Sequence, residues 1–294
     1  MSMKAERSNN NPATGTMMNI SDSEFAALRK MIYTRFGINL TEKKRSLLVG
    51  RLQKMLRTNK INTFEDYYRH LEQDTSGKAV SDLINLISTN YTYFNREKEH
   101  FDYYLSTALP SVCEALHKRG EKDLRVWCAG CSTGEEAYTL LMLTHEYLGS
   151  EYPRWDAGLL ATDISERVLT TARAGIYPAD RVASLPEKLQ RKYFTKLQSG
   201  QMQVNQNIRQ EVTFRRFNLM NTSFPFKRPF HIIFCRNVMI YFDQTTRDAL
   251  VQRFHRFLEP KGYFFIGHSE TLGRDSELFR YIMPAVYQKG ANHS

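Results

Sequence analysis

The sequence predicts an α/β protein with a mostly parallel sheet, preceded by a small all-helical domain. From about residue 100 onward, β-branched and aromatic runs alternate with helical patterns, which is typical of a parallel sheet covered on both faces. Before that point, the chain carries capped helical patterns and no convincing strand. Its 294 residues, 41% of them hydrophobic and 24% charged, fit about two globular domains.

The composition also excludes several classes of protein. Four cysteines in a chain of 294 residues do not make a disulfide framework, so we expect a reducing cytoplasm. No apolar run approaches the roughly 18–20 residues of a membrane-spanning helix, so we expect no membrane insertion. The first residues lack the apolar segment of a secretory signal. Residues 1–19 are polar and predict a disordered tail.

The charge is strongly basic and unevenly distributed. Lys and Arg number 41 against 31 Asp and Glu, which gives a formal net charge of +10. This balance favours an acidic partner, and the alternative is that it only serves solubility. Residues 41–60 hold seven basic residues and one acidic residue, so +6 of the total lies on one expected helix. That density favours a docking surface over a merely solvated face.

Helix-capping patterns define the helical domain, residues 20–88. Ser21 and Glu24 fit a capping box, with Ile20 and Phe25 as its hydrophobic staple. The expected helices run from Ser21 to about Phe36 with a stop at Gly37, from Thr41 to about Thr58, from Thr63 onward, and from Lys78 to Ile87. A linker at 89–100 leads to the core, residues 101–294.

The core pattern predicts alternating strands and helices. Strands are expected at 124–128, 158–162, 212–217, 231–235, 262–267 and 285–288. Helices are expected at 134–148, after a cap at Ser165, and at 246–257. A small insertion at about 175–211 interrupts this rhythm. It contains a second capping box, Ser184 with Glu187, and a hairpin turn at Ser199 and Gly200.

Candidate functional residues gather after the first expected strand. Ligands of open parallel sheets bind outside the carboxyl ends of the strands. The loop CAGCSTGEEA at 128–137 has small residues, with Gly130 among them, and is followed by a helix N-terminus. Glu135 and Glu136 make it unlike a phosphate-binding loop and suited to a cationic ligand or to hydroxyl and ammonium donors. It matches neither G-x-G-x-x-G nor the G-K-[ST] ending.

Further polar residues follow the other strands. Asp163 ends the second strand, where an acid commonly binds ribose hydroxyls, and the alternative is capping of the next helix. Asn218 and Leu219 follow the third strand, and Arg236 and Asn237 follow the fourth. All of them are predicted to line one edge of the sheet.

Four stretches resemble the chemotaxis receptor methyltransferases, the CheR family: TNYTYFNRE at 89–97, WCAGCSTGEE at 127–136, CRNVMIYFD at 235–243 and GHSE at 267–270. The resemblance runs from about residue 21 to residue 288. It implies a class I Rossmann-like methyltransferase core with a small inserted subdomain after an all-helical domain. It also implies methyl transfer from S-adenosyl-L-methionine to glutamates of bacterial chemoreceptors, which yields γ-carboxyl methyl esters and S-adenosyl-L-homocysteine.

The resemblance also implies roles for matching residues. Contacts to the methionine end of the cofactor and the active site are implied for Asn90, Thr92 and Arg96. Glu136, in the loop that holds Gly130, would meet the cofactor ammonium, and Asp163 would hold the ribose. The remaining implied contacts are Asn218 and Leu219 beside the adenine and Arg236 and Asn237 near the sulfonium.

The implied reaction depends on alignment of the acceptor with the methyl group more than on acid–base catalysis. A glutamate carboxylate is ionised near pH 7, so it needs no general base. The enzyme must align it with the methyl group and exclude water. Arg96 and Tyr241 are the predicted catalytic residues, with Arg96 in a positioning role. The alternatives are an interdomain salt bridge for Arg96 and a core position for Tyr241.

The resemblance also implies a partner for the basic helix, namely the helical methylation region of the receptor. Arg51, Lys54 and Arg57 are the predicted receptor contacts, and their charge would raise the rate of association. Some members of the family dock on a C-terminal receptor peptide through a longer, glycine-richer loop. Here LQSGQMQ at 197–203 is compact, so we expect no such tether. The enzyme would act in the cytoplasm, recruited to receptor arrays.

Other assignments are weighed against this one. The C-x-x-C of Cys128 and Cys131 lacks a thioredoxin pattern or a second zinc pair, so a structural role is favoured over a thiol-sensitive pocket, and no metal is expected. His268 has no hydrolase motif around it. A nucleic-acid methyltransferase is the first alternative function, although the N-P-P-Y signature is absent and no nucleic acid is expected as partner. A non-catalytic cofactor-binding scaffold is the second.

Overall fold

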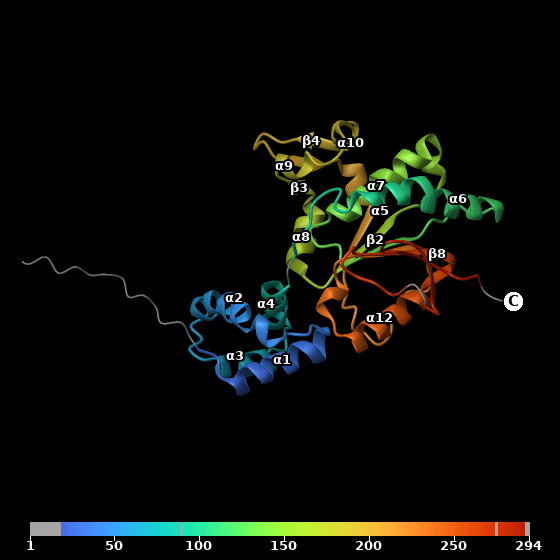
Figure 1. The fold of residues 1–294 in the computed structure, drawn as a ribbon. Coiled ribbons are helices and arrows are strands. Elements are labelled where there is room, and N and C mark those ends of the chain that lie inside the picture. The colour runs from blue at the N-terminus through green and yellow to red at the C-terminus, as the bar shows by residue number, and fades with distance from the viewer. Residues whose placement is uncertain (1–18, 89, 274–275, 292–294) are drawn as a thin grey trace, which may run out of the picture.

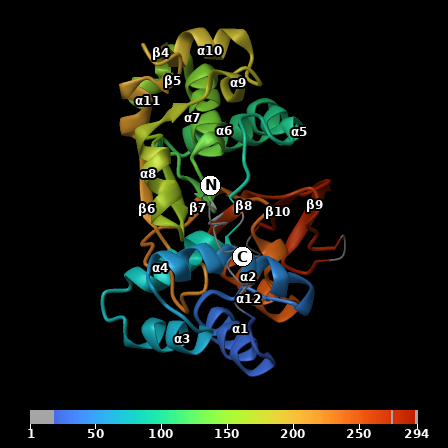
Figure 2. The ribbon, with the colours of Figure 1, turned by 90° about the vertical axis from the view of Figure 1, so that its left-hand side faces the viewer.

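The structure is a computed structural model that describes residues 19–88, 90–273 and 276–291. The predicted disordered tail lies, but for Asn19, outside these described residues. A group of helices lies at one end of the molecule, a sheet with helices on both sides forms the middle, and a small β-containing unit projects at the other end (Figures 1 and 2). Within the described residues, no helix has the length and apolar character to cross a membrane.

The helices of the helical domain begin and end largely where the sequence predicts. They are α1 (Asp22–Phe36), α2 (Arg45–Thr58), α3 (Phe64–Gln73) and α4 (Lys78–Ile87), with a 3₁₀ turn, η1 (Glu42–Lys44), before α2. The capping box of Ser21 and Glu24 is present, and Gly37 ends α1 in the left-handed conformation. Thr63 caps α3 by accepting from Asp66 N.

Helical structure begins directly after Thr41, as predicted, but the predicted cap is wrong. Thr41 makes no side-chain capping bond, and residues 42–44 form the 3₁₀ turn η1 before α2 begins at Arg45. Arg45 is instead paired with Asp22, at 2.6 Å between Nη1 and Oδ1. This ion pair ties the start of α2 to α1.

The central sheet has seven strands in the order β6-β2-β1-β7-β8-β10-β9. They are β1 (Val126–Ala129), β2 (Leu159–Asp163), β6 (Val212–Arg216), β7 (Phe230–Cys235), β8 (Leu258–Ile266), β9 (Phe279–Met283) and β10 (Val286–Lys289). The five strands from β6 to β8 pair in parallel, whereas β10 runs antiparallel to both of its neighbours. The order changes direction at β1, so the carboxyl ends of β1 and β7 flank the switch point.

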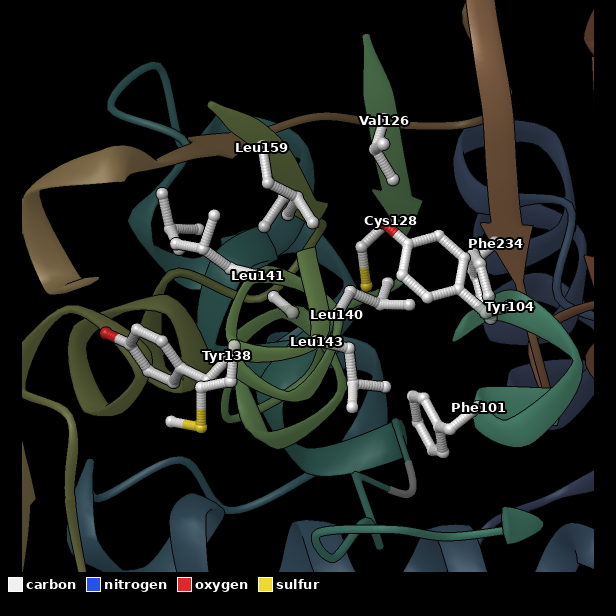
Figure 3. Packing of buried hydrophobic residues seen from close by; sticks show 14 of the residues in the cluster. Phe101, Tyr104, Val126, Cys128, Tyr138, Leu140, Leu141, Leu143, Leu159 and Phe234 are labelled. Atoms are coloured by element: carbon white, nitrogen blue, oxygen red, sulfur yellow. The ribbon is translucent and has the colours of Figure 1, made fainter. Parts of the chain in front are cut away.

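Alternate residues of the strands pack into two separate cores. Val126 and Cys128 of β1 point to the side covered by α5 (Lys98–Tyr103), α6 (Leu109–Lys118) and α7 (Glu135–Leu148). Trp127 and Ala129 point to the other side, where α12 (Gln244–Arg256) packs. Figure 3 shows Leu140, Leu141 and Leu143 of α7 close to the first set. Side chains along β1 thus alternate between two cores, one on each face of the sheet. This confirms the predicted α/β class with helices on both faces.

The segment between α8 (Glu166–Ala174) and β6 folds as a separate small sheet. It contains β3 (Ile176–Tyr177), α9 (Ala179–Val182), α10 (Glu187–Tyr193), β4 (Phe194–Lys196), β5 (Met202–Val204) and α11 (Gln206–Glu211). The predicted hairpin turn is confirmed, because β4 and β5 pair antiparallel around Gly200, whose φ is 81°. The cap at Ser165 is also confirmed.

The second predicted capping box, Ser184 with Glu187, is wrong. Pro186 occupies the N-cap position of α10, so the helix begins at Glu187 itself. The hydroxyl of Ser184 donates instead to the carbonyls of Phe94 and Arg181, at 2.9 and 3.0 Å. Ser184 therefore ties this unit to the segment that precedes α5.

Other differences concern the ends of the core elements. The sequence pattern did not resolve α5, α6 or the edge strand β9, and it placed the start of α12 two residues late. Asp243 rather than a later residue caps α12, by accepting from Thr246 N. The predicted strand at 262–267 begins at Leu258 in the structure.

The helical domain is bonded directly to the carboxyl edge of the core sheet. Ile38 forms an antiparallel bridge with Phe242, and Asn39 N donates to Tyr241 O at 2.8 Å. The side-chain amide of Asn218 donates to Arg35 O at 2.8 Å. These bonds place the end of α1 beside the residues that follow β6 and β7.

Candidate functional site

A cavity lies where the helical domain meets the carboxyl edge of the sheet. It contains about 1030 Å³ of empty space, part of it open to solvent. The predicted cofactor-binding and catalytic residues all line it: Asn90, Thr92, Arg96, Gly130, Glu136, Asp163, Asn218, Leu219, Arg236, Asn237 and Tyr241. They come from the linker and from the loops after four parallel strands, so the topology brings them together.

The loop after β1 turns tightly beneath this cavity. Gly130 has a φ of 89°, and a Cβ on it would lie 2.4 Å from Cγ2 of Val238. Its N–H donates to Thr162 O of β2 at 2.7 Å. Glycine is required here both by the left-handed backbone and by the approach of the segment after β7.

Asp163 fixes this loop against β2. Its two carboxylate oxygens accept from Ser132 N and Ser165 N, each at 2.9 Å. Burial raises the pKa of Asp163, and these backbone N–H groups offset part of the rise. The N–H of Ile164 also bonds to this carboxylate. Because a carboxylate accepts about four hydrogen bonds, Asp163 still has acceptor capacity left for a ligand. The structure thus shows a local structural role for Asp163 as well as its place in the cavity wall.

Arg236 is the buried centre of the charged residues. Its Nη1 lies 2.9 Å from Oε2 of Glu136, and its Nη2 lies 3.0 Å from Oε2 of Glu97. Nη2 also donates to Arg96 O at 2.5 Å. One guanidinium therefore links the linker, the start of α7 and the end of β7.

The two carboxylates beside Arg236 respond differently to this environment. Burial raises the pKa of Glu136, and the charge of Arg236 only partly opposes the rise. Burial also acts on Glu97, but Arg236 and the amide of Asn237 outweigh it and lower the pKa of that carboxyl. Glu97 is thus held as a carboxylate that orients Arg236. Glu136 is the acid that becomes protonated first when the pH falls.

Arg96 lines the cavity, and among the described residues its side chain contacts its own segment of the chain. Its Nη1 donates to Tyr91 O at 2.8 Å, and its Nε lies 4.0 Å from Oε1 of Glu97. Both partners belong to the same segment of the chain. These contacts of Arg96 are local and hold the linker in shape.

The linker is also bonded to the loop after β1. Ser132 Oγ donates to Asn90 O at 3.0 Å, and the amide of Asn90 donates to Ser88 Oγ at 3.1 Å. Thr92 lines the cavity two residues further along. The linker therefore forms one wall of the cavity.

Apolar and amide groups complete the lining. Phe36, Ile38, Phe217, Leu219 and Phe242 contribute the apolar part. Asn218 is bonded to both sides of the domain junction, since Met220 N donates to its Oδ1 at 3.0 Å and its amide reaches Arg35 O. Asn218 thus shapes the wall beside these apolar side chains.

A buried carboxylate that the site prediction omitted holds the segment after β7. Glu270 accepts from Asn237 N at 2.9 Å, from Gly267 N at 2.6 Å and from Ile240 N at 3.1 Å. Asn237 has a φ of 58°, so the turn that it makes is strained for a residue with a side chain. The GHSE motif at 267–270 was a usable signal for Glu270. Glu97 was signalled by its place at the end of the TNYTYFNRE stretch, beside Arg96.

Tyr241 lies in the cavity wall next to the helical domain. Its carbonyl accepts from Asn39 N, and the ammonium of Lys44 lies 5.5 Å from the centre of its ring. Tyr241 is half-buried, so its ring is reachable from the cavity side rather than enclosed in the core.

The predicted receptor contacts divide into two kinds. Lys54 and Arg57 are exposed on α2, whereas Arg51 is half-buried. Nη1 of Arg51 donates to Leu86 O and Ile87 O, both at 3.1 Å. Arg51 therefore caps the end of α4 with a cation, which favours the helix dipole.

The cysteines near the loop are buried and protonated. Cys128 donates to Oε1 of Glu136 at 3.2 Å, and Cys131 lines the cavity. Burial raises the pKa of both thiols well above the ordinary value. Cys235 lies on the neighbouring strand β7, as predicted, but its side chain packs on the opposite face of the sheet from Cys128. Such thiols are poor nucleophiles, which fits the structural interpretation.

One group of potential metal ligands occurs in the described ranges. Glu97, His100 and His268 bring ligand atoms within 4.8 Å of one another. The same Oε2 of Glu97 that faces His100 is bonded to Arg236. The guanidinium would repel a cation at this position, so we assign no metal to the group.

Comparison with known proteins extends these observations. The profile described as "CheR methyltransferase, SAM binding domain" matches residues 90–287, and that described as "CheR methyltransferase, all-alpha domain" matches residues 23–88. The chain is 44% identical over 272 residues to the chemotaxis protein methyltransferase of Borreliella burgdorferi, covering 92% of this chain and 96% of the relative. It is 35% identical to chemotaxis protein methyltransferase 2 of Pseudomonas aeruginosa (90% and 92% covered) and 36% identical to the chemotaxis protein methyltransferase of Escherichia coli K12 (91% of each).

Proposed function

The chain belongs to the CheR methyltransferase family, and we propose that it methylates glutamate side chains of bacterial chemoreceptors to γ-carboxyl methyl esters. Its core is a methyltransferase domain that binds S-adenosylmethionine. One observation carries the assignment of the site: the residues that the resemblance marks as cofactor contacts line a single cavity.

The lining of that cavity fits S-adenosylmethionine in its chemistry. Glu136 would face the ammonium group, and Asp163, with lone pairs left over, would accept from the ribose hydroxyls. Leu219, Phe217 and Ile38 would surround the adenine with apolar surface. When bound, the cofactor supplies an electrophilic methyl group on a sulfonium.

The chain itself must align the acceptor and exclude water. A glutamate carboxylate is already ionised at neutral pH and needs no general base. Arg96 and Tyr241 line the cavity and are the residues we propose to position this carboxylate. Arg96 keeps donors beyond its bond to Tyr91 O, since a guanidinium has five N–H groups. Closure of the cavity by the helical domain would keep water from the acceptor.

The proposed partner is the helical methylation region of a chemoreceptor. Lys54 and Arg57 offer exposed positive charge on α2, which would speed association with a surface rich in glutamates. The hairpin of β4 and β5 is compact, so we propose docking without a C-terminal receptor peptide. The enzyme would work in the cytoplasm at receptor arrays.

The test is transfer of label from methyl-labelled S-adenosylmethionine to membranes that contain chemoreceptors, followed by mild alkali. We expect volatile, base-labile label, because carboxyl methyl esters hydrolyse to methanol. Arg96→Ala should abolish the transfer while cofactor binding is retained. Arg256→Ala removes the same charge from an exposed position on α12 and is the matched control. Label found only in nucleic acid would overturn the proposal.

A further inference from the structure

Lys44 places a cation beside Tyr241, a residue of the cavity wall. It is the last residue of η1 and the N-cap residue of α2, and its side chain is half-buried. Its ammonium lies 5.5 Å from the ring centre of Tyr241. The bridge between Ile38 and Phe242 and the bond from Asn39 to Tyr241 fix the segment before Lys44 on the core. These bonds hold the segment that carries Lys44 next to Tyr241.

Two neighbouring cations are held in ion pairs. Arg236 is bonded to Glu97 and Glu136, whereas Arg96 uses one N–H on Tyr91 O and keeps other donors for the acceptor. Arg45, the next residue in the chain, is paired with Asp22. In the part of the chain that the structure describes, Lys44 has no carboxylate within ion-pair distance. Its three N–H donors are thus left for a ligand or for water.

We propose that Lys44 selects the ionised glutamate side chain of the receptor by binding one of its carboxylate oxygens beside Tyr241. This inference rests on the proposed function and deepens it, since it names the group that reads the charge of the acceptor. A glutamine has the same length as glutamate but no charge, and an already methylated glutamate is neutral and longer by one methyl group. Neither would gain the attraction of the ammonium, so both would be bound less well.

The balance of the transfer explains why this contact favours turnover. A carboxylate oxygen forms a bond to the methyl carbon, and the bond from that carbon to sulfur breaks with its electron pair left on sulfur. No proton is released, and the acceptor changes from an anion to a neutral ester. The attraction to Lys44 is therefore lost when the product forms, which favours release of the methylated side chain.

The test compares two receptor fragments that differ at one methylation position, with Glu or Gln. The Glu fragment is assayed as substrate and the Gln fragment as a competitive inhibitor. For Lys44→Met we expect the KM for the Glu fragment to rise roughly tenfold or more, the size expected for loss of a hydrogen bond to a charged group. The inhibition constant of the Gln fragment should stay the same, and Lys44→Arg should keep most of the discrimination.

Lys43→Met is the matched control, because Lys43 is exposed on the same 3₁₀ turn and the variant loses the same charge. This variant should change the KM by less than about twofold, because it loses only a long-range attraction that salt screens. Equal affinity of S-adenosylmethionine and equal melting temperatures show that both variants fold. Equal effects of Lys43→Met and Lys44→Met, or equal weakening of both fragments, would overturn the role of Lys44 alone. If the wild type methylated no receptor fragment, the proposed function would fall and this inference with it.

Discussion

The guanidinium of Arg236 forms a buried ion pair with Glu136, with 2.9 Å between Nη1 and Oε2. The pair joins the end of β7 to the start of α7 across the switch point of the sheet. Since Glu136 is the residue we assign to the cofactor ammonium, the pair also sets the charge that the cofactor meets.

Replacing Arg236 by Met should destabilise the protein and abolish cofactor binding. The change leaves Glu136 and Glu97 without their cation, and removal of one partner of a buried pair costs about 3–5 kcal/mol. Urea unfolding and calorimetric titration with S-adenosylmethionine measure the two effects. The double variant with Glu136→Gln should recover part of the stability but not the binding. A single variant as stable as the wild type would contradict this assignment.

Binding of S-adenosylmethionine should weaken as the pH falls. Burial raises the pKa of Glu136 above its ordinary 4.5, so this acid becomes protonated earlier on acidification than an exposed glutamate. The neutral form cannot attract an ammonium, and affinity should fall by up to about tenfold per pH unit once protonation begins. Titrations between neutral pH and 4.5 test this. Glu136→Gln should bind the cofactor weakly, and its affinity should depend less on pH. If the affinity of this variant fell as steeply with pH as that of the wild type, another group would be the one that titrates.

Gly130→Ala should impair both folding and cofactor binding. The added Cβ would lie 2.4 Å from Val238 Cγ2, and the residue would keep a left-handed backbone that costs about 1–3 kcal/mol. A second change, Val238→Ala, removes the steric part alone. The double variant should therefore recover some stability over Gly130→Ala in thermal unfolding, and no recovery would mean that backbone strain is the whole cause.

The stability of the protein should depend on the neutrality of His231. Burial, followed by the charge of Arg125, lowers the pKa of His231 to about 3 from 6.5. Between these values the unfolded chain binds a proton that the folded chain does not, so this group's contribution is present above pH 6.5 and is lost on acidification. The loss should be about 1.4 kcal/mol per pH unit. Urea unfolding of the wild type and of His231→Gln at several pH values isolates this contribution. If the free energies of unfolding of the two proteins changed in parallel with pH, the assignment to His231 would be contradicted.

Much of the site followed from the sequence because parallel strands end at one edge of their sheet. Gly130, Asp163, Asn218 and Arg236 are far apart in the chain, yet each follows a strand, so topology alone predicts their convergence. The parallel order and the helices on both faces followed from the alternation of strand and helix patterns. Such features can be predicted from short stretches of sequence alone.

Other features depend on contacts that no local pattern reports. Glu97 reaches Arg236 from a backbone with a φ of 55°, and tertiary contacts stabilise that conformation. Phe36 and Ile38 line the cavity only because the helical domain docks on residues 241 and 242. The pattern at Ser184 resembled a capping box, but Pro186 determined where the helix starts. The strand β9 lies at the sheet edge, where burial alternates too weakly to mark it.

We propose that the acceptor is a glutamate carboxylate of a receptor. The most direct measurement is peptide mapping by mass spectrometry of a receptor fragment after incubation with the enzyme and S-adenosylmethionine. We expect a mass increase of one methylene on a glutamate, its removal by mild alkali, and its loss when that glutamate is replaced by aspartate or alanine. A stable increase on a lysine, an arginine or an N-terminus would contradict it.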